Sequence, residues 1–404
     1  MSKLGYIKPL DAIRGIGCSI VVMFHWPFPT FNSPAGWEWL QYFFVMSGFL
    51  ITRILLNEKK KYPVKTFLKR FYTKRAYRIF PVYFAFIFFW GLVYLLVKDN
   101  AYWAKEFGEV KRNIWYLLTY TYNFMPYIEQ LRGGNTLSTP IFGHTWSLSV
   151  EEQFYFVFPF FVYFLSIKNL RRVILFIIII MPLARIWGYH HLMSINPDKA
   201  WVSMNLYHLT PLQLDSLGFG VLLGTTDLQK ERRADRWTLL LLGMLVMNYV
   251  VQLYIAHLSG LRFRDITGGG HIEQWIIYNQ QYIYLFTLVN VLSYFSVMAF
   301  IKGQYYKPIF ENKVFCYLGK VSYGLYIYHL PLVGVMYLLL KKYKLVGLVA
   351  SNMWLELMVL IIYWSILLLI THCSFQYFES YFLRLKEKMD AKAKMKSQNV
   401  TPIS

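Results

Sequence analysis

Long apolar runs alternate with short charged segments along the whole chain. A helix needs about 20 mainly apolar residues to cross about 30 Å of hydrocarbon, and about ten segments meet this criterion. They lie near residues 10–29, 37–57, 79–97, 145–167, 173–189, 204–226, 238–257, 275–301, 315–340 and 345–371. The stretch near 113–124 is too short to span, so we expect it to lie at the interface or to re-enter. The pattern predicts an all-α integral membrane protein, a bundle of about ten transmembrane helices.

The composition agrees with a membrane-embedded chain rather than with two or three soluble domains. Of the 404 residues, 56% are hydrophobic and 20% are aromatic. The formal net charge of +21 would suit a nucleic-acid partner if the basic residues formed one patch. They are instead grouped between the apolar runs, so we expect contacts with membrane lipids and no nucleic acid.

The distribution of Lys and Arg predicts the orientation of the bundle. With the N-terminus inside, the inner segments hold about 27 of these residues and the outer segments about 11. This asymmetry predicts cytoplasmic N- and C-termini for a multi-pass protein of the cell inner membrane. We expect a transmembrane domain over residues 1–371 and a basic cytoplasmic tail over residues 372–404.

The cysteines give no sign of a disulfide framework or a metal centre. Cys18, Cys316 and Cys373 lie in or beside apolar segments. They form no CxxC motif and have no His/Cys spacing typical of zinc ligands. We therefore expect no disulfide and no metal.

Three ionisable residues of the first apolar segment fall on one helix face. Such side chains cost several kcal/mol inside a span, so by default they face the bundle interior. With about 100° per residue, Asp11, Arg14 and His25 lie at about 0°, 300° and 320°. His25 lies roughly 16 Å beyond Arg14 along the helix. This stripe is expected to join the cytoplasmic side to a deep histidine.

Each of these residues has two interpretations. Burial favours the neutral imidazole, so His25 could accept a proton from a hydroxyl group, or it could be a hydrogen-bonded interior histidine. Arg14 could serve that same site, or it could anchor the inner edge and pair with Asp11 at i, i+3.

The segment 143–161 carries four candidate residues, His144, Trp146, Glu151 and Glu152. Adjacent helical residues point about 100° apart, so at most one of the two glutamates is expected to face a given site. That carboxylate could orient an imidazole or bind a sugar, and Trp146 could stack on a sugar ring. Alternatively, Ser147 or Ser149 caps a helix start and the aromatic residues belong to the interfacial belt.

Two further motifs lie within the second expected span and just before the third. Ser47 and Gly48 are small residues of the kind that lets membrane helices approach closely. Arg75 and Arg78, at i, i+3 spacing, could clamp phosphates, or they could reflect only the basic character of a cytoplasmic segment.

Two ionisable residues lie in later spans. His329 lies in a segment that Pro331 can kink, and as a lone histidine it suits a structural role. Asp215 is followed by small residues and suits a packing or gating element.

Six blocks together resemble a known family. They are "LDAIRGIGCSIVVMFH", "FFVMSGFLIT", "RFYTKRAYRIFPVYF", "HTWSLSVEEQFYFVFP", "QLDSLGFGVLLG" and "LGKVSYGLYIYHLPL". In this order they resemble the signature blocks of the membrane acyltransferase 3 family, over roughly residues 6–335.

The resemblance implies a membrane O-acyltransferase with about ten core helices. It would move an acyl group, usually acetyl from acetyl-CoA or another acyl-CoA, to a hydroxyl of a cell-surface glycan or its lipid-linked precursor. Some relatives carry a hydrolase-like domain after the bundle, and we expect this chain to be the stand-alone form. The resemblance says nothing of the oligomeric state.

The resemblance also assigns roles to individual residues. His25 matches the family's essential histidine and Arg14 its partner. The other matches are Ser47, Gly48 and Phe49 for the second-span motif, Arg75 and Arg78 for the inner arginine pair, and Glu151 or Glu152 for the carboxylate. Two departures are Ala12, where glycine is frequent, and Gln213, where we expect a basic residue before Asp215.

These residues suggest a mechanism and leave a rival. The CoA phosphates would bind Arg75 and Arg78, the pantetheine arm would follow the stripe from Arg14, and His25 would act as general base or be acylated transiently. A glutamate or a hydrogen-bonding network would fix its tautomer. The rival is a non-enzymatic glycan transporter or flippase, but no paired short segments occur in matching halves.

Overall fold

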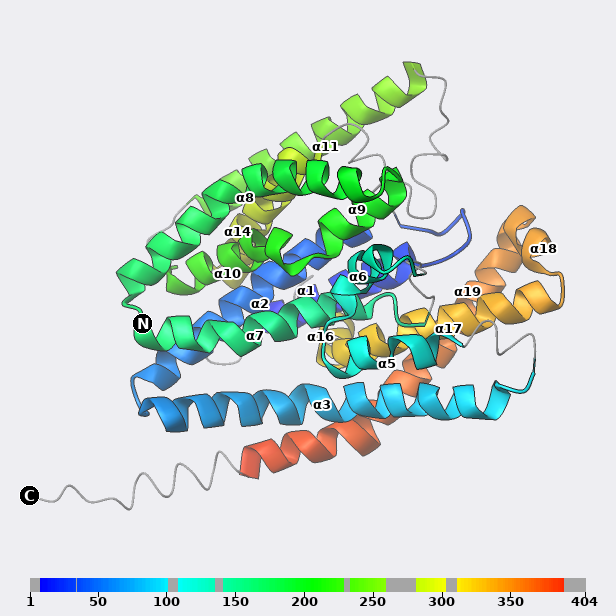
Figure 1. Ribbon diagram of the computed structural model, residues 1–404, viewed down its shortest axis with the longest axis horizontal. Helices are drawn as coiled ribbons and strands as arrows, with labels where there is room; N and C mark the ends of the chain where they lie inside the picture. Colours follow the sequence, from blue (N-terminus) through cyan, green and yellow to red (C-terminus); the bar gives the residue numbers. More distant parts are fainter. Residues whose placement is uncertain are drawn as a thin grey trace, which may run out of the picture.

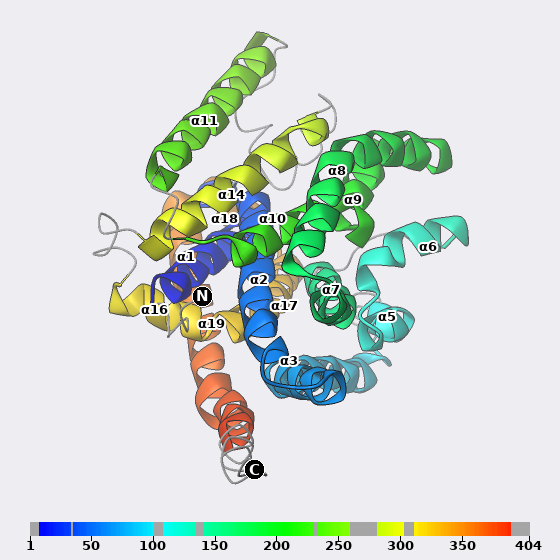
Figure 2. The same cartoon turned by 90° about the vertical axis from the view of Figure 1, so that its left-hand side faces the viewer.

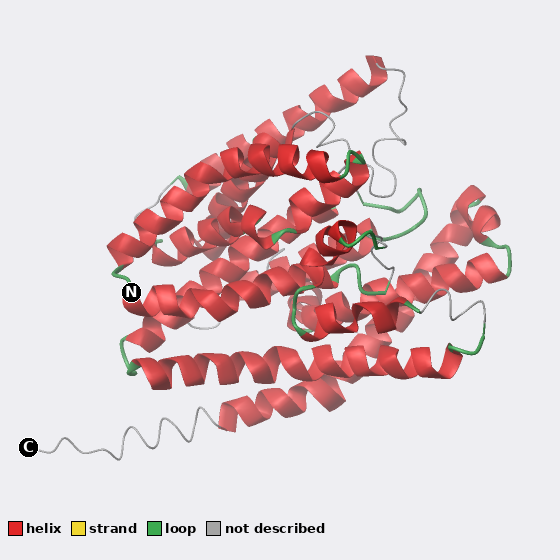
Figure 3. Cartoon of the chain, viewed as in Figure 1, coloured by secondary structure: helices red, strands yellow, loops and turns green. Residues whose placement is uncertain are grey.

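The described part of the chain is a bundle of helices without strands (Figures 1 and 3). A computed structural model describes residues 8–33, 35–100, 108–134, 141–228, 233–258, 281–302 and 311–388. Seven helical segments among them are long and apolar enough to cross a membrane. They are α2 (Gly36–Lys59), α3 (Val64–Val97), α8 (Ile167–Ile195), α11 (Ala234–Leu258), η3 with α14 (Gln281–Ile283, Leu285–Lys302), α17 (Ser322–Lys342) and α19 continued to Lys388 (Met353–Cys373).

Three of the about ten expected spans are absent from these seven. The segment 10–29 forms α1 (Lys8–Phe24), which has only 17 residues. The segment 145–167 forms α7 (Thr145–Phe164), which has 20 residues but is less apolar than the seven because it contains Glu151, Glu152 and Gln153. The segment 204–226 is not one helix. It divides into α9 (Lys199–His208), the short turn η2 (Thr210–Leu212) and α10 (Leu214–Thr225), because Pro211 lacks the amide hydrogen that a continuous helix needs.

Other boundaries also differ from the hydropathy pattern. The basic stretch 58–78 is mostly helical, because it includes the end of α2 and because α3 begins at Val64 and carries residues 64–78 on its first turns. The stretch near 113–124 forms α5 (Glu109–Leu118) and η1 (Tyr122–Phe124), followed by α6 (Met125–Leu131), and each is too short to span. The start of the expected span 275–301 lies outside the described residues.

The last helices form a hairpin beside α3. The short helices α16 (Lys313–Lys320) and α18 (Val346–Ser351) flank α17, and a π-helical turn, η4 (Ser374–Glu379), continues α19. The last helical stretch of the chain, drawn in red, extends below α3 in Figure 1. The end of the expected tail, residues 389–404, lies outside the described residues.

The centre of the bundle contains α1 and α2 (Figure 2). Glycines let their backbones approach neighbouring helices. A Cβ on Gly48 of α2 would collide with the Leu217 carbonyl of α10, and one on Gly319 of α16 would collide with the Asp11 carbonyl of α1. The expected role of Gly48 in close packing is confirmed.

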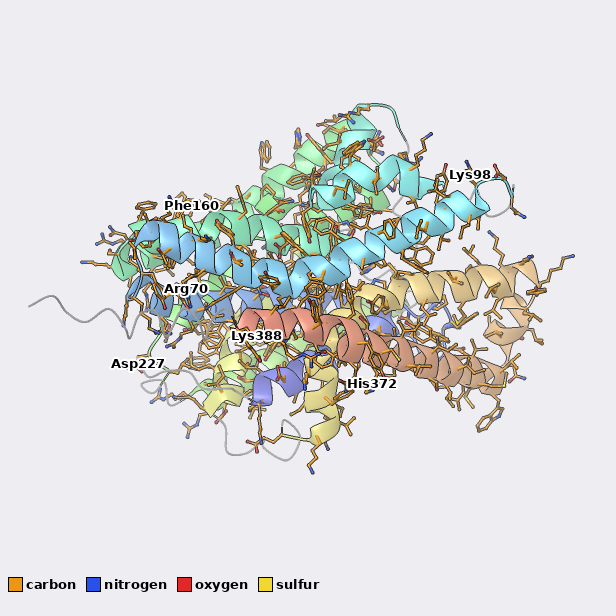
Figure 4. The ribbon with its side chains drawn as sticks, turned by 90° about the horizontal axis from the view of Figure 1, so that it is seen from below. Arg70, Lys98, Phe160, Asp227, His372 and Lys388 are labelled. Carbon is orange, nitrogen blue, oxygen red and sulfur yellow. The ribbon has the colours of Figure 1, made fainter. Side chains whose placement is uncertain are left out.

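Charged residues gather toward the ends of the long helices. In Figure 4, Arg70, Asp227 and Lys388 lie toward one end of the bundle and Lys98 lies at the other. The first three fall in segments that the charge distribution assigns to the inner side, and Lys98 falls in an outer one. We call the end that holds Arg70 the basic end.

Candidate active site

A cavity of about 1160 Å³ opens among α1, α2, α3, α7, α17 and the C-terminal helix. Its charged lining includes more cations than anions. The cations are Arg14, Arg53, Lys60, Lys61, Arg70, Lys74, Arg75, Arg78 and Lys320, and the anions are Asp11, Glu58, Glu151, Glu152 and Glu379. This excess of positive charge, in a cavity large enough for a nucleotide-sized ligand, suits an anionic ligand.

Not every cation of the cavity is equally available. Glu58 binds Arg70 and Lys74, each at 3.1 Å. Arg14 pairs with Asp11 at a looser 3.7 Å, so the expected i, i+3 pair exists and both partners still line the cavity. The arginine therefore retains donors for a ligand.

The two arginines of α3 both reach the cavity. Arg75 lies over the ring of Tyr155, 3.8 Å from its centroid, so the aromatic face holds the guanidinium in place. Arg78, one turn later, is exposed. Both side chains line the cavity, and their positions are compatible with phosphate binding.

A polar cluster joins the second span to α7 on the wall of the cavity. Ser47 donates to Glu151 at 2.6 Å, and the Tyr155 hydroxyl lies 2.9 Å from the other carboxylate oxygen and 3.0 Å from the Ser47 hydroxyl. Glu152 lines the same cavity. Both glutamates thus line this wide cavity, and the expectation that at most one of them faces the reaction site stays a prediction.

The start of α7 also differs from the expected cap. Neither Ser147 nor Ser149 caps the helix, which begins earlier, at Thr145, without a side-chain cap. Trp146 is buried and stacks on His208 with ring centroids 4.3 Å apart. That face is therefore covered by a protein ring, and the sugar-stacking interpretation does not apply to it.

Three histidines from distant segments meet in the interior. His25 follows the last residue of α1, His144 precedes α7, and His329 lies in α17. The rings of His25 and His329 have centroids 5.0 Å apart, and those of His144 and His329 lie 5.1 Å apart. His144 and His329 are almost fully buried, whereas His25 is partly exposed.

Backbone carbonyls fix the tautomers of His25 and His329. The Tyr326 carbonyl can only accept, so the proton of neutral His329 lies on Nδ1, which is 2.6 Å from it. The Val21 carbonyl, 2.9 Å from His25 Nδ1, likewise places the proton of His25 on Nδ1. His329 Nε2, at 3.2 Å, is then a second acceptor for that same proton. This assignment leaves the lone pair of His25 on Nε2, where it can take a proton.

Tyr326 lies between the cavity and the histidines. It lines the cavity with Cys18 and Ser147, and its hydroxyl is 2.5 Å from the Ser147 hydroxyl. Its ring packs on His144 and His329, with centroids 5.4 and 5.3 Å away. Asp11, Arg14 and Cys18 reach the cavity but His25 does not, so the expected continuous stripe along α1 is interrupted at this tyrosine.

The remaining candidates hold helices together. Phe49 is buried in a second apolar cluster. Asp215 binds Arg185 of α8 at 2.5 Å and accepts from Asn290 of α14 at 3.2 Å. The cation expected near Asp215 thus comes from another helix, while Gln213 bonds to Gln41 of α2 at 2.9 Å.

The sequence did not single out Tyr155 or Tyr326, although a signal existed for both. Tyr155 lies one turn after Glu151, and Tyr326 lies three residues before His329. Side chains at i, i+3 and i, i+4 share a helix face. A search for polar neighbours of each candidate at these spacings would have found both tyrosines.

Comparisons with known proteins place the chain in a family. The model of the acyltransferase 3 family, described as an acyltransferase domain, matches residues 7–374. O-acetyltransferase OatA of Staphylococcus aureus is 25% identical over 336 residues, which cover 81% of this chain and 51% of OatA. A protein of S. aureus strain COL, provisionally named an O-acetyltransferase, is 26% identical over 340 residues, 82% of this chain and 51% of that protein.

One further relative matches over a shorter stretch. An uncharacterised protein of Haemophilus influenzae is 34% identical over 185 residues, 45% of this chain and 71% of that protein. The chain spans about half the length of the S. aureus relatives, 51%. No solved structure matches it. Since the family model covers nearly the whole chain, this multi-pass membrane protein belongs to the acyltransferase 3 family.

Proposed function

We propose that this protein transfers an acyl group, first of all acetyl, from cytoplasmic acyl-CoA to a hydroxyl of a cell-surface glycan or its lipid-linked precursor. The observation that supports this most directly is the arrangement along α1. A large basic cavity reaches Cys18 and Tyr326, and the Tyr326 ring also packs on His144 and His329 of the histidine cluster. The bundle would span the cell inner membrane with its basic end on the cytoplasmic side.

The donor would bind in the cavity. Acyl-CoA carries several phosphate charges, and Arg75, Arg78 and Arg14 present guanidinium groups to this space. The thioester end of the pantetheine arm would then point toward Tyr326. This orientation places the most charged part of the donor where water and cations are available, and its least charged part next to the apolar interior.

The acceptor hydroxyl would react at His25. After the Tyr326 ring has moved out of the path between the cavity and His25, Nε2 of His25 would take the hydroxyl proton while the oxygen attacks the thioester carbonyl. When the tetrahedral adduct collapses, the carbon–sulfur bond breaks, and His25 can return the proton to the leaving CoA thiolate. The Val21 carbonyl and His329 Nε2, which both accept from His25 Nδ1, would hold the His25 tautomer in place of a glutamate, and His144 packs beside His329.

The polar cluster at Glu151 would organise the donor side of the site. Its carboxylate is engaged by Ser47 and Tyr155, and Tyr155 supports Arg75. Glu152 remains available on the same wall. Among the described residues, no hydrogen bond joins either glutamate to His25, so we assign them to the cavity rather than to proton transfer from the acceptor.

The test is an acyl-transfer assay with membranes that contain this protein, radiolabelled acetyl-CoA and candidate glycans. His25→Ala should lower the transfer rate by about 10²–10⁴-fold, the usual contribution of a general base. Arg75→Ala with Arg78→Ala should instead raise the concentration of acetyl-CoA needed for half-maximal rate. A His25→Ala variant with the wild-type rate would refute the proposed role of His25. Glycan movement without any acyl donor would favour a transporter.

A further inference from the structure

Side-chain hydrogen bonds hold the chain segment that follows His25. Its backbone leaves the helix at Phe24 and turns before α2 begins. The Asn32 amide donates to the carbonyl oxygens of Phe24 and Trp26, at 2.9 and 2.6 Å. These two carbonyls flank His25, so its backbone is fixed on both sides.

A buried carboxylate from the other end of the chain completes this arrangement. Glu356, on the first turn of α19, is fully buried. Its Oε1 accepts from the Trp26 indole and from the Phe31 backbone amide, both at 3.1 Å. Its Oε2 accepts from the Thr30 amide at 3.4 Å. All three donors belong to the seven residues that begin at His25.

The energetics make a purely space-filling role a poor explanation. A buried carboxylate is costly unless hydrogen bonds compensate the lost water, and an apolar residue would fill the same space without that cost. The rest of α19 is almost entirely apolar. Its Tyr363 packs on the Trp26 ring at 5.4 Å and donates to the His329 carbonyl at 3.1 Å. Helix α19 thus contacts Trp26, which follows His25, and the backbone of His329.

We propose that Glu356 is a positioning residue that holds residues 26–31 and thereby aims His25 at the reacting atoms. This inference rests on the proposed function. Glu356 acts through the backbone after His25 and touches neither the cavity nor the donor. Its loss should therefore change the rate of the chemical step and leave donor binding unchanged.

Kinetics of three variants test the proposal. Glu356→Met keeps the volume and removes all acceptors, so kcat should fall about 10- to 100-fold, as a displacement of about 1 Å can produce. The KM for acetyl-CoA should stay within about twofold, since uniform binding is untouched. Glu356→Gln keeps an oxygen at Oε1 and should recover most of kcat. Trp26→Phe removes one donor and should have a smaller effect than Glu356→Met.

A labelling experiment tests the same contact without any assay of activity. Thr30→Cys, in a chain whose Cys316 and Cys373 are serine, is treated with a membrane-impermeant maleimide. Adding Glu356→Met should accelerate labelling several-fold, because the segment is released. Asn352→Ala is the matched control: it removes the N-cap of α19, which accepts from Trp354 and Leu355, and leaves the three bonds to Glu356 in place.

The outcomes separate this proposal from the proposed function. Unchanged labelling with Glu356→Met, or equal acceleration with Asn352→Ala, would refute the proposed contact. Faster labelling with an unchanged kcat would refute positioning of His25. A His25→Ala variant with wild-type activity would instead refute the proposed function, and the labelling result would still decide whether Glu356 holds the segment.

Discussion

Two aspartate–arginine pairs within the described residues differ in almost every physical respect. Arg185 and Asp215 are fully buried side chains on α8 and α10, and their charged atoms lie 2.5 Å apart. Arg14 and Asp11 are neighbours on α1, about one-fifth exposed, and 3.7 Å apart. The first pair is closed on all sides by protein, and the second faces the cavity.

The difference indicates which pair can serve a ligand. Arg185 also donates to the Leu212 carbonyl, and Asn290 donates to Asp215, so a ligand would have to break bonds between three helices. Arg14 keeps a long contact with Asp11 and faces water, so an anionic group can join it at little cost. The same two residue types therefore hold helices in one place and receive charge in the other.

The largest effect should follow when the closed pair is broken. Arg185→Met leaves Asp215 as an uncompensated buried charge, so the free energy of unfolding should fall by about 3–5 kcal/mol. Denaturant unfolding of the purified protein in detergent measures this change. Acetyl-CoA affinity of the folded fraction should be unchanged. A loss below about 1 kcal/mol would mean that water reaches the pair.

Removal of the open arginine should affect binding more than stability. Arg14→Ala should weaken acetyl-CoA binding by about 1.5–3 kcal/mol, the value of a hydrogen bond to a charged group, which corresponds to about 10- to 100-fold. Its free energy of unfolding should change by less than about 1 kcal/mol. Equilibrium binding of labelled acetyl-CoA gives the first number. Wild-type affinity would exclude Arg14 from the donor site.

Removal of both members of the closed pair should cost less than removal of one. Arg185→Met with Asp215→Leu places apolar groups of similar size in the site, and such replacements are often neutral. The free energy of unfolding should return to within about 1 kcal/mol of the wild-type value, by the same denaturant measurement. If the double variant is as unstable as Arg185→Met, the pair contributes more than charge compensation.

Salt should produce the smallest effect and still separate the two pairs. Raising the ionic strength from about 0.1 M to 1 M shortens the Debye length from about 10 to about 3 Å. The exposed cations of the cavity are then screened, so acetyl-CoA affinity should fall several-fold, and the difference between wild type and Arg14→Ala should shrink. The thermal stability contributed by Arg185 should not follow the same trend. Affinity independent of salt would argue against phosphate binding by these cations.

Much of the architecture could be predicted from hydropathy, and its errors have local causes. Seven expected spans coincide with long apolar helices. The hydropathy pattern does not show the break between α9 and α10, because a window of about 20 residues over the mainly apolar run 204–226 averages over Pro211. The start of α3 at Val64 was missed because a basic helix surface and a basic loop have the same hydropathy.

The candidate site could be predicted as a set of residues and less well as a geometry. His25 was singled out from its place in an apolar run, and its partner His329 was expected to be a lone structural histidine. The two are 304 positions apart, and their nitrogens lie 3.2 Å apart. Nothing in the sequence singles out Glu356, since one acidic residue at the start of an apolar segment is also typical of a helix beginning.

The sequence by itself determined that the chain is helical and embedded in a membrane, and which residue types carry its chemistry. These properties follow from local composition and from periodicity along one helix. Only the tertiary structure decided that Tyr326 interrupts the path from Arg14 to His25, that carbonyl oxygens set the histidine tautomers, and that Asp215 pairs with Arg185. The physical reason is that hydrogen bonds and ion pairs act over about 3 Å, and helix packing sets which distant residues come that close.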